Sequence, residues 1–164
     1  MAVVFTASLV LLTILVPLCE GSCCPNFFMR KGAWCYHYSS TKKDWNGANS
    51  ACKALGAELV SIHGPDESNE IYGFWQSLLD EGKADDGDFS YWIGLHDLQY
   101  EGYYQWSDGT DVNFLLWQSG EPNNNGNEDC VAPRNQGSNA EKQFWNDYNC
   151  SEKKPYFCRF PISS

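Results

Sequence analysis

Two stretches of sequence decide the fold and the candidate site. They are Glu121-Pro122-Asn123-Asn124-Asn125-Gly126-Asn127-Glu128-Asp129 and, further along, Trp145-Asn146-Asp147. The surrounding segment, residues 118–129, is polar and rich in Asn and Gly, and it follows the period of neither a helix nor a strand. A long loop inside a compact domain is usually functional or disordered. The candidate site is therefore sought in this loop.

Carboxylate and amide oxygens are concentrated in both segments, and a calcium ion is bound by about six to eight such oxygens. Taken alone, the loop is better explained as a solvated turn, because Asn, Gly and acidic residues dominate turns for backbone reasons. Cys130 and Cys150 are placed to tie the two segments together, and this combination favours a cation site. We expect a cis Glu121–Pro122 bond, which would turn the flanking side chains toward one point.

The composition limits the class of protein. The chain has 164 residues, of which 43% are hydrophobic and 15% aromatic, and its formal net charge is -10. This length suits one domain, and the aromatic content is too high for a disordered chain. The negative charge excludes nucleic acid as a partner, because the phosphate backbone would be repelled.

The N-terminal segment has the pattern of an export signal. Residues 3–18 are a nearly unbroken apolar run, and small residues follow around Gly21. The run is shorter than the roughly 20 residues that span a bilayer, so a membrane anchor is the less favoured alternative. We predict a signal peptide over residues 1–21, and a secreted single domain over residues 22–164 without membrane insertion.

Two helices are predicted in the first half of the chain. Thr41 and Asp44 have the spacing of a capping box, and Gly56 is placed to end the helix that they open. The apolar positions of this helix are Trp45, Ala48, Cys52 and Leu55. The second helix follows Gly64-Pro65 and has the stronger apolar period. Its apolar positions are Ile71, Phe74, Trp75, Leu78 and Leu79.

The second half changes character from Phe89 onward. Short aromatic runs there are separated by Gly, Asp and Asn, which is typical of strands and loops. Helices early and strands late predict an α+β fold with the helices segregated from an antiparallel sheet. Four tryptophans in these runs are expected in the core rather than in contact with a sugar. They are Trp92, Trp106, Trp117 and Trp145.

The cysteines agree with export. Of eight in the chain, Cys19 lies in the predicted signal peptide, which leaves seven, so pairing six of them leaves one for a partner chain or a cap. Structural zinc is disfavoured, because the three histidines lie near no pair of cysteines at ligand spacing. The residues alone leave the pairing open.

Three motifs in order resemble the C-type lectin-like domain family. Trp92-Ile93-Gly94-Leu95 resembles its core strand motif, Glu121-Pro122-Asn123 its sugar-specificity motif, and Trp145-Asn146-Asp147 its calcium motif. The resemblance covers residues 24–160 and implies the C-type lectin-like fold in its long form. It also implies three disulfides, Cys24–Cys35, Cys52–Cys158 and Cys130–Cys150.

The resemblance implies a primary Ca2+ site that also binds sugar. Its ligands would be Glu121, Asn123, Glu128, Asn146 and Asp147. In the family, two neighbouring sugar hydroxyls bind the ion, the carboxylates accept their protons, and the Asn amides donate to their lone pairs. Glu before and Asn after Pro122 is similar to members that prefer mannose, glucose or fucose, and galactose-type specificity is the alternative.

An auxiliary calcium ion is implied by the same resemblance, with Glu128 shared between the two sites. Its further ligands would be Asp97, Glu101 and Asp129. This sequence departs from the pattern at Asn124, where mannose-binding relatives usually have a carboxylate. Ordinary surface acids are the alternative explanation.

The predicted function is carbohydrate binding without catalysis, on glycans of microbial or cell surfaces, in innate recognition or agglutination. A glycosidase would use Glu121 and Glu128, but an acid catalyst needs a raised pKa and a cation lowers it. A lectin-like domain that binds a protein, a lipid or another non-sugar ligand is the alternative from another class. Cys23 lies outside the family bridges and is expected to link two chains in a homodimer, as in echinoderm-type body-fluid lectins, which begin similarly.

Overall fold

The computed structural model describes residues 24, 29–31, 34–84, 90–134 and 143–162. Within them, the chain forms two helices and two four-stranded sheets. Paired strands within each sheet are antiparallel. The predicted α+β class is therefore confirmed.

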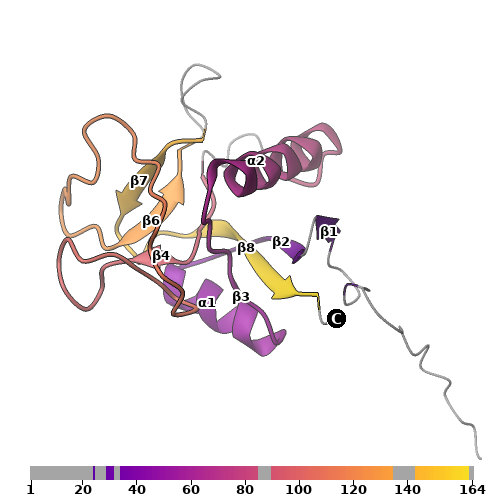
Figure 1. Ribbon diagram of the computed structural model, residues 1–164, viewed down its shortest axis with the longest axis horizontal. Helices are drawn as coiled ribbons and strands as arrows, with labels where there is room; N and C mark the ends of the chain where they lie inside the picture. Colours follow the sequence, from indigo (N-terminus) through magenta and orange to yellow (C-terminus); the bar gives the residue numbers. More distant parts are fainter. Residues whose placement is uncertain (1–23, 25–28, 32–33, 85–89, 135–142, 163–164) are drawn as a thin grey trace, which may run out of the picture.

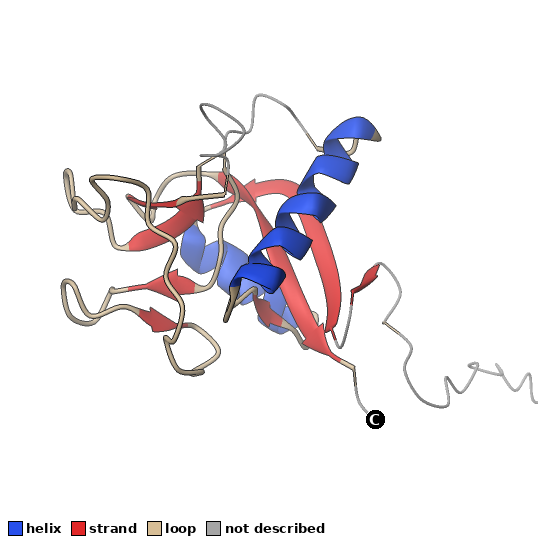
Figure 2. Ribbon diagram, turned by 45° about the horizontal axis from the view of Figure 1, so that its top comes forward, coloured by secondary structure: helices blue, strands red, loops and turns tan. Residues whose placement is uncertain are grey.

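The first sheet joins the two ends of the described chain. Its order is β1 (Met29–Lys31), β2 (Trp34–Lys43), β8 (Lys154–Pro161) and β3 (Glu58–Leu59). The β2 strand pairs with β8 from Trp34↔Pro161 to Lys43↔Lys154, with an irregularity between Ser39 and Lys43. The two helices lie on opposite sides of this sheet (Figures 1 and 2).

The second sheet lies away from the C-terminus (Figure 1). Its order is β5 (Gln105–Trp106), β4 (Leu95–His96), β6 (Cys130–Pro133) and β7 (Trp145–Tyr148). The register sets Val131 opposite Asp147 and Ala132 opposite Asn146. This pairing holds the motif Trp145-Asn146-Asp147 on β7 beside β6, the strand that follows the polar loop of residues 118–129.

The first helix, α1 (Trp45–Ala54), begins later than the capping-box prediction implied. Its N-cap is Asp44, whose Oδ1 accepts a hydrogen bond from the backbone N–H of Gly47 at 2.8 Å. Thr41 belongs instead to β2, so the predicted capping box is wrong. The pairing of β2 with β8 keeps this part of the chain extended. Gly56, with φ +71°, follows the helix as predicted.

The second helix, α2 (Pro65–Asp80), confirms the stronger apolar period. Its buried face includes Ile71, Phe74, Trp75 and Leu78. The Phe74 ring lies 5.4 Å from that of Phe157 on β8, which fixes the helix against the first sheet.

The strands differ from the prediction in order and in length. β1 and β2 precede the first helix, and β3 lies between the two helices, so the strands are not confined to the second half. β4 and β5 have two residues each, at the ends of the aromatic runs. Pairing with strands distant in the chain, which local pattern does not reveal, decides these boundaries.

The predicted core tryptophans pack inside the protein. Trp92, Trp106 and Trp145 are buried, and the half-buried Trp117 packs edge-on against Trp145. Three disulfides staple the structure in the pairing that the resemblance implies: Cys24–Cys35, Cys52–Cys158 and Cys130–Cys150. The last one joins the start of β6 to the residues just after β7.

Other predictions fall on residues that the structure does not describe. The proposed signal peptide over residues 1–21 and the proposed interchain Cys23 both lie outside the described ranges. Among the helices that are described, neither has the length and apolar content needed to cross a bilayer.

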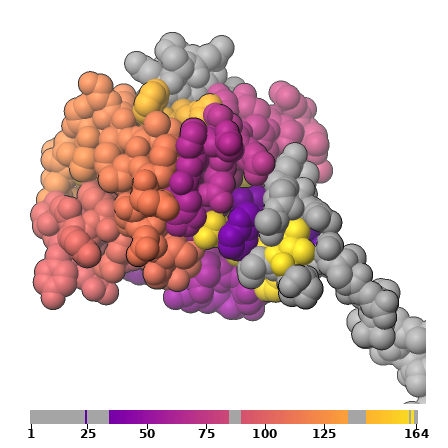
Figure 3. Space-filling model, viewed as in Figure 1, coloured from indigo at the N-terminus to yellow at the C-terminus, as the bar shows by residue number. Residues whose placement is uncertain are grey.

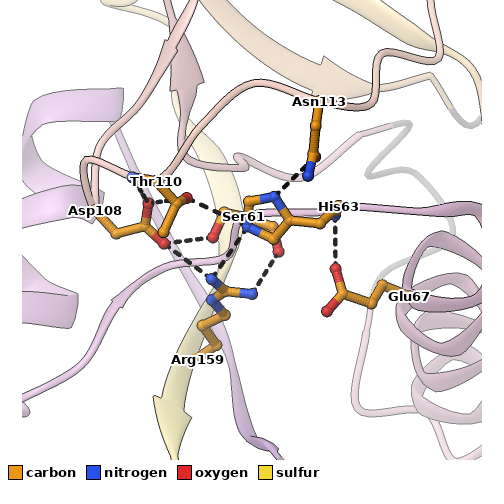
Figure 4. Close-up of polar contacts among 7 residues, drawn as sticks. All are labelled: Ser61, His63, Glu67, Asp108, Thr110, Asn113 and Arg159. Atoms are coloured by element: carbon orange, nitrogen blue, oxygen red, sulfur yellow. Dashed lines mark hydrogen bonds and ion pairs between the residues drawn. The ribbon is translucent and has the colours of Figure 1, made fainter.

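A buried ion pair anchors the segment after β5 to the first sheet (Figure 4). Arg159 of β8 donates from Nη2 to Asp108 Oδ2 at 3.0 Å and from Nη1 to the carbonyl oxygen of Ser61 at 3.0 Å. The Asp108 carboxylate also accepts hydrogen bonds from the hydroxyls of Ser61 and Thr110. Three distant parts of the chain therefore meet at one carboxylate.

We expect Asp108→Asn to destabilise the protein by about 3 kcal/mol at pH 7, because it leaves the buried Arg159 guanidinium without its counter-charge. Burial alone would raise the pKa of Asp108, but hydrogen bonds from Ser61 and Thr110 and the charge of Arg159 lower it below its ordinary value. A carboxyl group whose pKa is lowered by folding stabilises the folded state at pH values above its unfolded pKa of about 3.9. This stabilisation is lost as the pH falls through the pKa of the folded state.

Urea unfolding at several pH values measures this effect. The difference between wild type and Asp108→Asn should be largest near neutral pH and shrink below about pH 4. Asp111→Asn, at an exposed carboxylate nearby, is the control and should change stability by less than about 0.5 kcal/mol. A difference that does not vary with pH would contradict the role given to the Asp108 charge.

Candidate functional site

The candidate loop, residues 118–129, lies at the surface in the long segment that connects β4 to β6 and includes β5. The part of the chain between these strands, coloured salmon to orange, covers the left of the molecule in Figure 3. The Glu121–Pro122 bond is cis, as expected. Asn124 and Asn127 have φ values of 47° and 69°, a region that Asn tolerates better than most residues. The Asn-rich composition thus suits the turns of this loop.

Asp147 of β7 holds the loop against the second sheet. Its carboxylate accepts hydrogen bonds from the backbone N–H of Asn123 at 3.1 Å and of Asn124 at 2.8 Å. The Asp147 side chain is fully buried, and its position is set by the pairing of β7 with β6. The two segments singled out in the sequence therefore meet directly.

Four of the five predicted primary ligands line one pocket of about 380 Å³. They are Glu121, Asn123, Glu128 and Asn146, whereas Asp147 lies behind the loop. Within the loop, the amide Nδ2 of Asn123 donates to Glu121 Oε2 at 2.6 Å, and the backbone N–H of Asn125 donates to Glu128 Oε2 at 3.0 Å. These bonds hold both carboxylates at the pocket.

Several carboxylate groups lie close together at the pocket. Burial raises the pKa of Glu121, and the neighbouring carboxylates of Asp147 and Glu128 add to the rise. Burial also raises the pKa of Glu128, and the charge of Asp147 adds to it. Three carboxylates this close repel one another when ionised, so a bound cation would be stabilised here.

The donor chemistry fits calcium, which prefers carboxylate and amide oxygens. Within the described ranges, no group of three or more His, Cys, Asp and Glu side chains is close enough together to hold a metal ion by itself. The predicted set therefore depends on the amide oxygens of Asn123 and Asn146 as well as on the carboxylates. The flexible coordination of calcium accommodates such a mixed set.

The predicted auxiliary ligands Asp97, Glu101 and Asp129 influence one another's charge, but no three acids among the described residues lie close enough together to hold a metal ion by themselves. Asp97 is buried, donates its backbone N–H to the carbonyl oxygen of Asp129 at 3.0 Å, and accepts the N–H of Gly102 at 2.8 Å. Partial loss of solvation raises the pKa of the exposed Glu101, and the charges of Asp97, Asp129 and Asp147 raise it further. Asp129 lines a different pocket from Glu128, together with Asp44 and Asn127.

The pocket also contains residues that the sequence analysis did not single out. They are Ser90, Arg134, Tyr148 and Lys154, which lie beside Asn125 of the candidate loop. Arg134 follows β6 directly, and Lys154 begins β8. No motif marks Arg134 or Lys154, but they closely follow Cys130 and Cys150, the two cysteines that are placed to tie this region together.

The comparisons with known proteins agree with this geometry. Residues 41–160 match the model of the family described as lectin C-type domain. The chain is 32% identical over 157 residues to a C-type lectin of Thrasops jacksonii, a lectoxin, and the match covers 94% of each chain. It is 37% identical over 128 residues to CD209 antigen-like protein C of Mus musculus, covering 76% of this chain and 62% of that protein.

Solved structures show the same fold. The C-type lectin CEL-I from Cucumaria echinata has a TM-score of 0.75 at 27% identity, over 85% of this chain and 99% of that one. The cow CD23 carbohydrate-recognition domain, solved in the presence of GlcNAc2Man3 oligosaccharide, has a TM-score of 0.71 at 30% identity, over 87% and 99%. The family match, the sequence relatives and the shared fold place this chain in the C-type lectin domain family.

Proposed function

We propose that this chain is a secreted, calcium-dependent lectin that binds mannose-, glucose- or fucose-type sugars without catalysing a reaction on them. One observation supports the proposal above the others: Glu121, Asn123, Glu128 and Asn146 line a single pocket, and Asp147 bonds the loop behind it. Export would follow from a signal peptide over residues 1–21, which leaves one domain over residues 22–164.

In this proposal, Glu121, Asn123, Glu128, Asn146 and Asp147 hold the ion. Calcium, when bound, supplies coordination positions that two vicinal sugar hydroxyls can take. The carboxylates of Glu121 and Glu128 accept the hydroxyl protons, and the Asn123 and Asn146 amides donate to the hydroxyl oxygens. Asp147 keeps the loop in place through the backbone of Asn123 and Asn124.

The order of Glu121 and Asn123 around Pro122 supports the mannose type, and galactose-type specificity is the second candidate. The acids Asp97, Glu101 and Asp129, with Glu128, are proposed as ligands of an auxiliary calcium ion, supported by the like charges that raise the pKa of Glu101. Because no three of these side chains lie close enough together to hold a metal ion as they stand, the ion would have to draw them together. A cysteine-linked dimer through Cys23 would present two sites at once and so strengthen attachment to microbial or cell surfaces.

Chromatography on immobilised mannose tests the proposal. We expect the oxidised protein to be retained in calcium and released by a chelator, because the sugar contact depends on the ion. Free mannose should also release it at lower concentration than free galactose does. Retention in chelator would contradict the calcium mechanism, and the reverse order of the two sugars would favour galactose specificity. Failure of any sugar to compete would favour a protein or lipid ligand instead.

A further inference from the structure

A second cavity lies outside the pocket of the candidate calcium ligands. It is lined by residues 103–106 and 109–112, which include β5, and it shares no lining residue with the candidate pocket. Its volume is about 610 Å³, within the range of roughly 300–1,000 Å³ that small-molecule sites occupy. This β5 cavity is therefore large enough for a ligand of its own.

Tyr103 brings an exposed aromatic ring to the β5 cavity. This residue is 68% exposed, whereas the other two aromatic residues of the wall, Tyr104 and Trp106, are half-buried and buried. An apolar ring face in contact with water gains free energy when a ligand covers it. Tyr103 is thus the residue of the wall from which a ligand would gain the most apolar contact.

The loop that carries Tyr103 is held by its own backbone. The N–H of Tyr103 donates to the carbonyl oxygen of Tyr100 at 2.9 Å, and the N–H of Tyr100 donates to that of Asp97 at 3.1 Å. The Asp97 carboxylate accepts the N–H of Gly102 at 2.8 Å, and the φ of +75° at this position suits glycine. Because the loop is ordered before a ligand arrives, binding there costs less conformational entropy.

Tyr104 connects the β5 cavity to the candidate calcium site. Its ring packs edge-on against that of Trp117 at 4.8 Å between centroids, and Trp117 directly precedes the 118–129 loop. Burial raises the pKa of Tyr104, and the charges of Asp97 and Asp147 add to the rise. Asp147 is the carboxylate that holds the loop from behind. One side chain therefore borders the cavity and lies within electrostatic reach of the candidate site.

The composition of the wall favours one class of ligand. Among the described residues that line the cavity, none is Lys, Arg or His, and the carboxylate of Asp111 is the only charged group at neutral pH, so an anion would be repelled. A purely apolar ligand would remove the Gln105 amide from water without replacing its hydrogen bonds. A neutral sugar has an apolar C–H face for the Tyr103 ring and hydroxyls for the Gln105 amide.

We propose that the β5 cavity binds a second, neutral sugar residue of an oligosaccharide whose first residue is bound at the calcium site, and that the Tyr103 ring packs against the apolar face of this second residue. The inference rests on the proposed function, because the calcium site holds the first sugar. The cavity by itself supplies one ring contact, so it raises the affinity for an oligosaccharide but does not retain a single sugar without the ion.

Calorimetric titration in calcium tests the inference by comparing mannose with linear, neutral oligosaccharides of increasing length and different linkages that end in mannose. We expect at least one oligosaccharide to bind about tenfold more tightly than mannose, because the second residue adds an aromatic contact. This gain should not change with ionic strength, since the second sugar carries no charge.

Tyr103→Ala should remove the gain and leave the affinity for mannose unchanged, which also shows that the calcium site is intact. Tyr103→Phe should keep the gain, because the ring remains. Tyr100→Ala is the matched control: it removes a ring from the same loop that is 72% exposed but does not line the cavity, and it should keep the gain.

Three results would each overturn this inference alone: binding of mannose with no gain for any oligosaccharide, a gain that survives Tyr103→Ala, or a gain that Tyr100→Ala removes as well. If neither mannose nor any oligosaccharide binds, the proposed function fails and this inference fails with it.

Discussion

Asp147→Asn is expected to lower the affinity for mannose by about a hundredfold. The variant replaces a buried carboxylate that accepts two backbone N–H groups, those of Asn123 and Asn124. An amide has one oxygen, so its NH2 group would face one of these N–H donors. The loop would lose a charge-assisted hydrogen bond and the proposed calcium site would lose a charged ligand, which together cost roughly 3 kcal/mol.

Calcium titration and retention on immobilised mannose measure this loss together. The control is Asp111→Asn, which removes an exposed carboxylate that lines a different pocket and should leave both measurements unchanged. Thermal unfolding without calcium separates a displaced loop from an unfolded domain, because α2 and the first sheet do not depend on Asp147. Normal mannose retention by a folded Asp147→Asn protein would contradict the assigned site.

Removing the Cys52–Cys158 disulfide by a double substitution to alanine is expected to cost about 5 kcal/mol of unfolding free energy. The two cysteines are 106 residues apart in sequence, and the chain-entropy model gives a larger penalty for a longer closed loop. Both side chains are fully buried in the core that joins α1 to β8. A loss of this size is comparable with the whole stability of many domains.

The matched comparison is the double substitution of Cys24 and Cys35, which are only 11 residues apart. The same model assigns this bridge about 3 kcal/mol, so the two variants should differ by about 2 kcal/mol in denaturant unfolding. Equal losses in the two variants would show that the long bridge does not act mainly on the unfolded chain.

Local sequence patterns predicted the helices better than the strands. The apolar period of α2 is contained in sixteen neighbouring residues, so burial of one helical face follows from the pattern alone. The capping box at Thr41 was wrong because β2 extends through Lys43 by pairing with β8, more than a hundred residues later. A local rule contains no information about such a partner.

The candidate site likewise separates what the local sequence predicts from what contacts between distant residues decide. Its oxygen donors were visible as residue types in residues 121–129 and 145–147, because calcium chemistry depends on the kind of atom. Their placement at one pocket depends on the β6–β7 register and on the Asp147 contacts. Arg134 and Lys154 carry no motif, so only the fold brought them to the pocket.

The sequence by itself determined the α+β class, the family resemblance and the chemistry of the site, because these depend on residue type and short spacing. The tertiary structure alone decided that β1 and β2 precede the helices, that Asp147 lies behind the loop, and that basic groups border the acidic ones. The physical reason is that strand pairing and pocket walls join residues far apart in the chain, and the free energy of those contacts is absent from any local window.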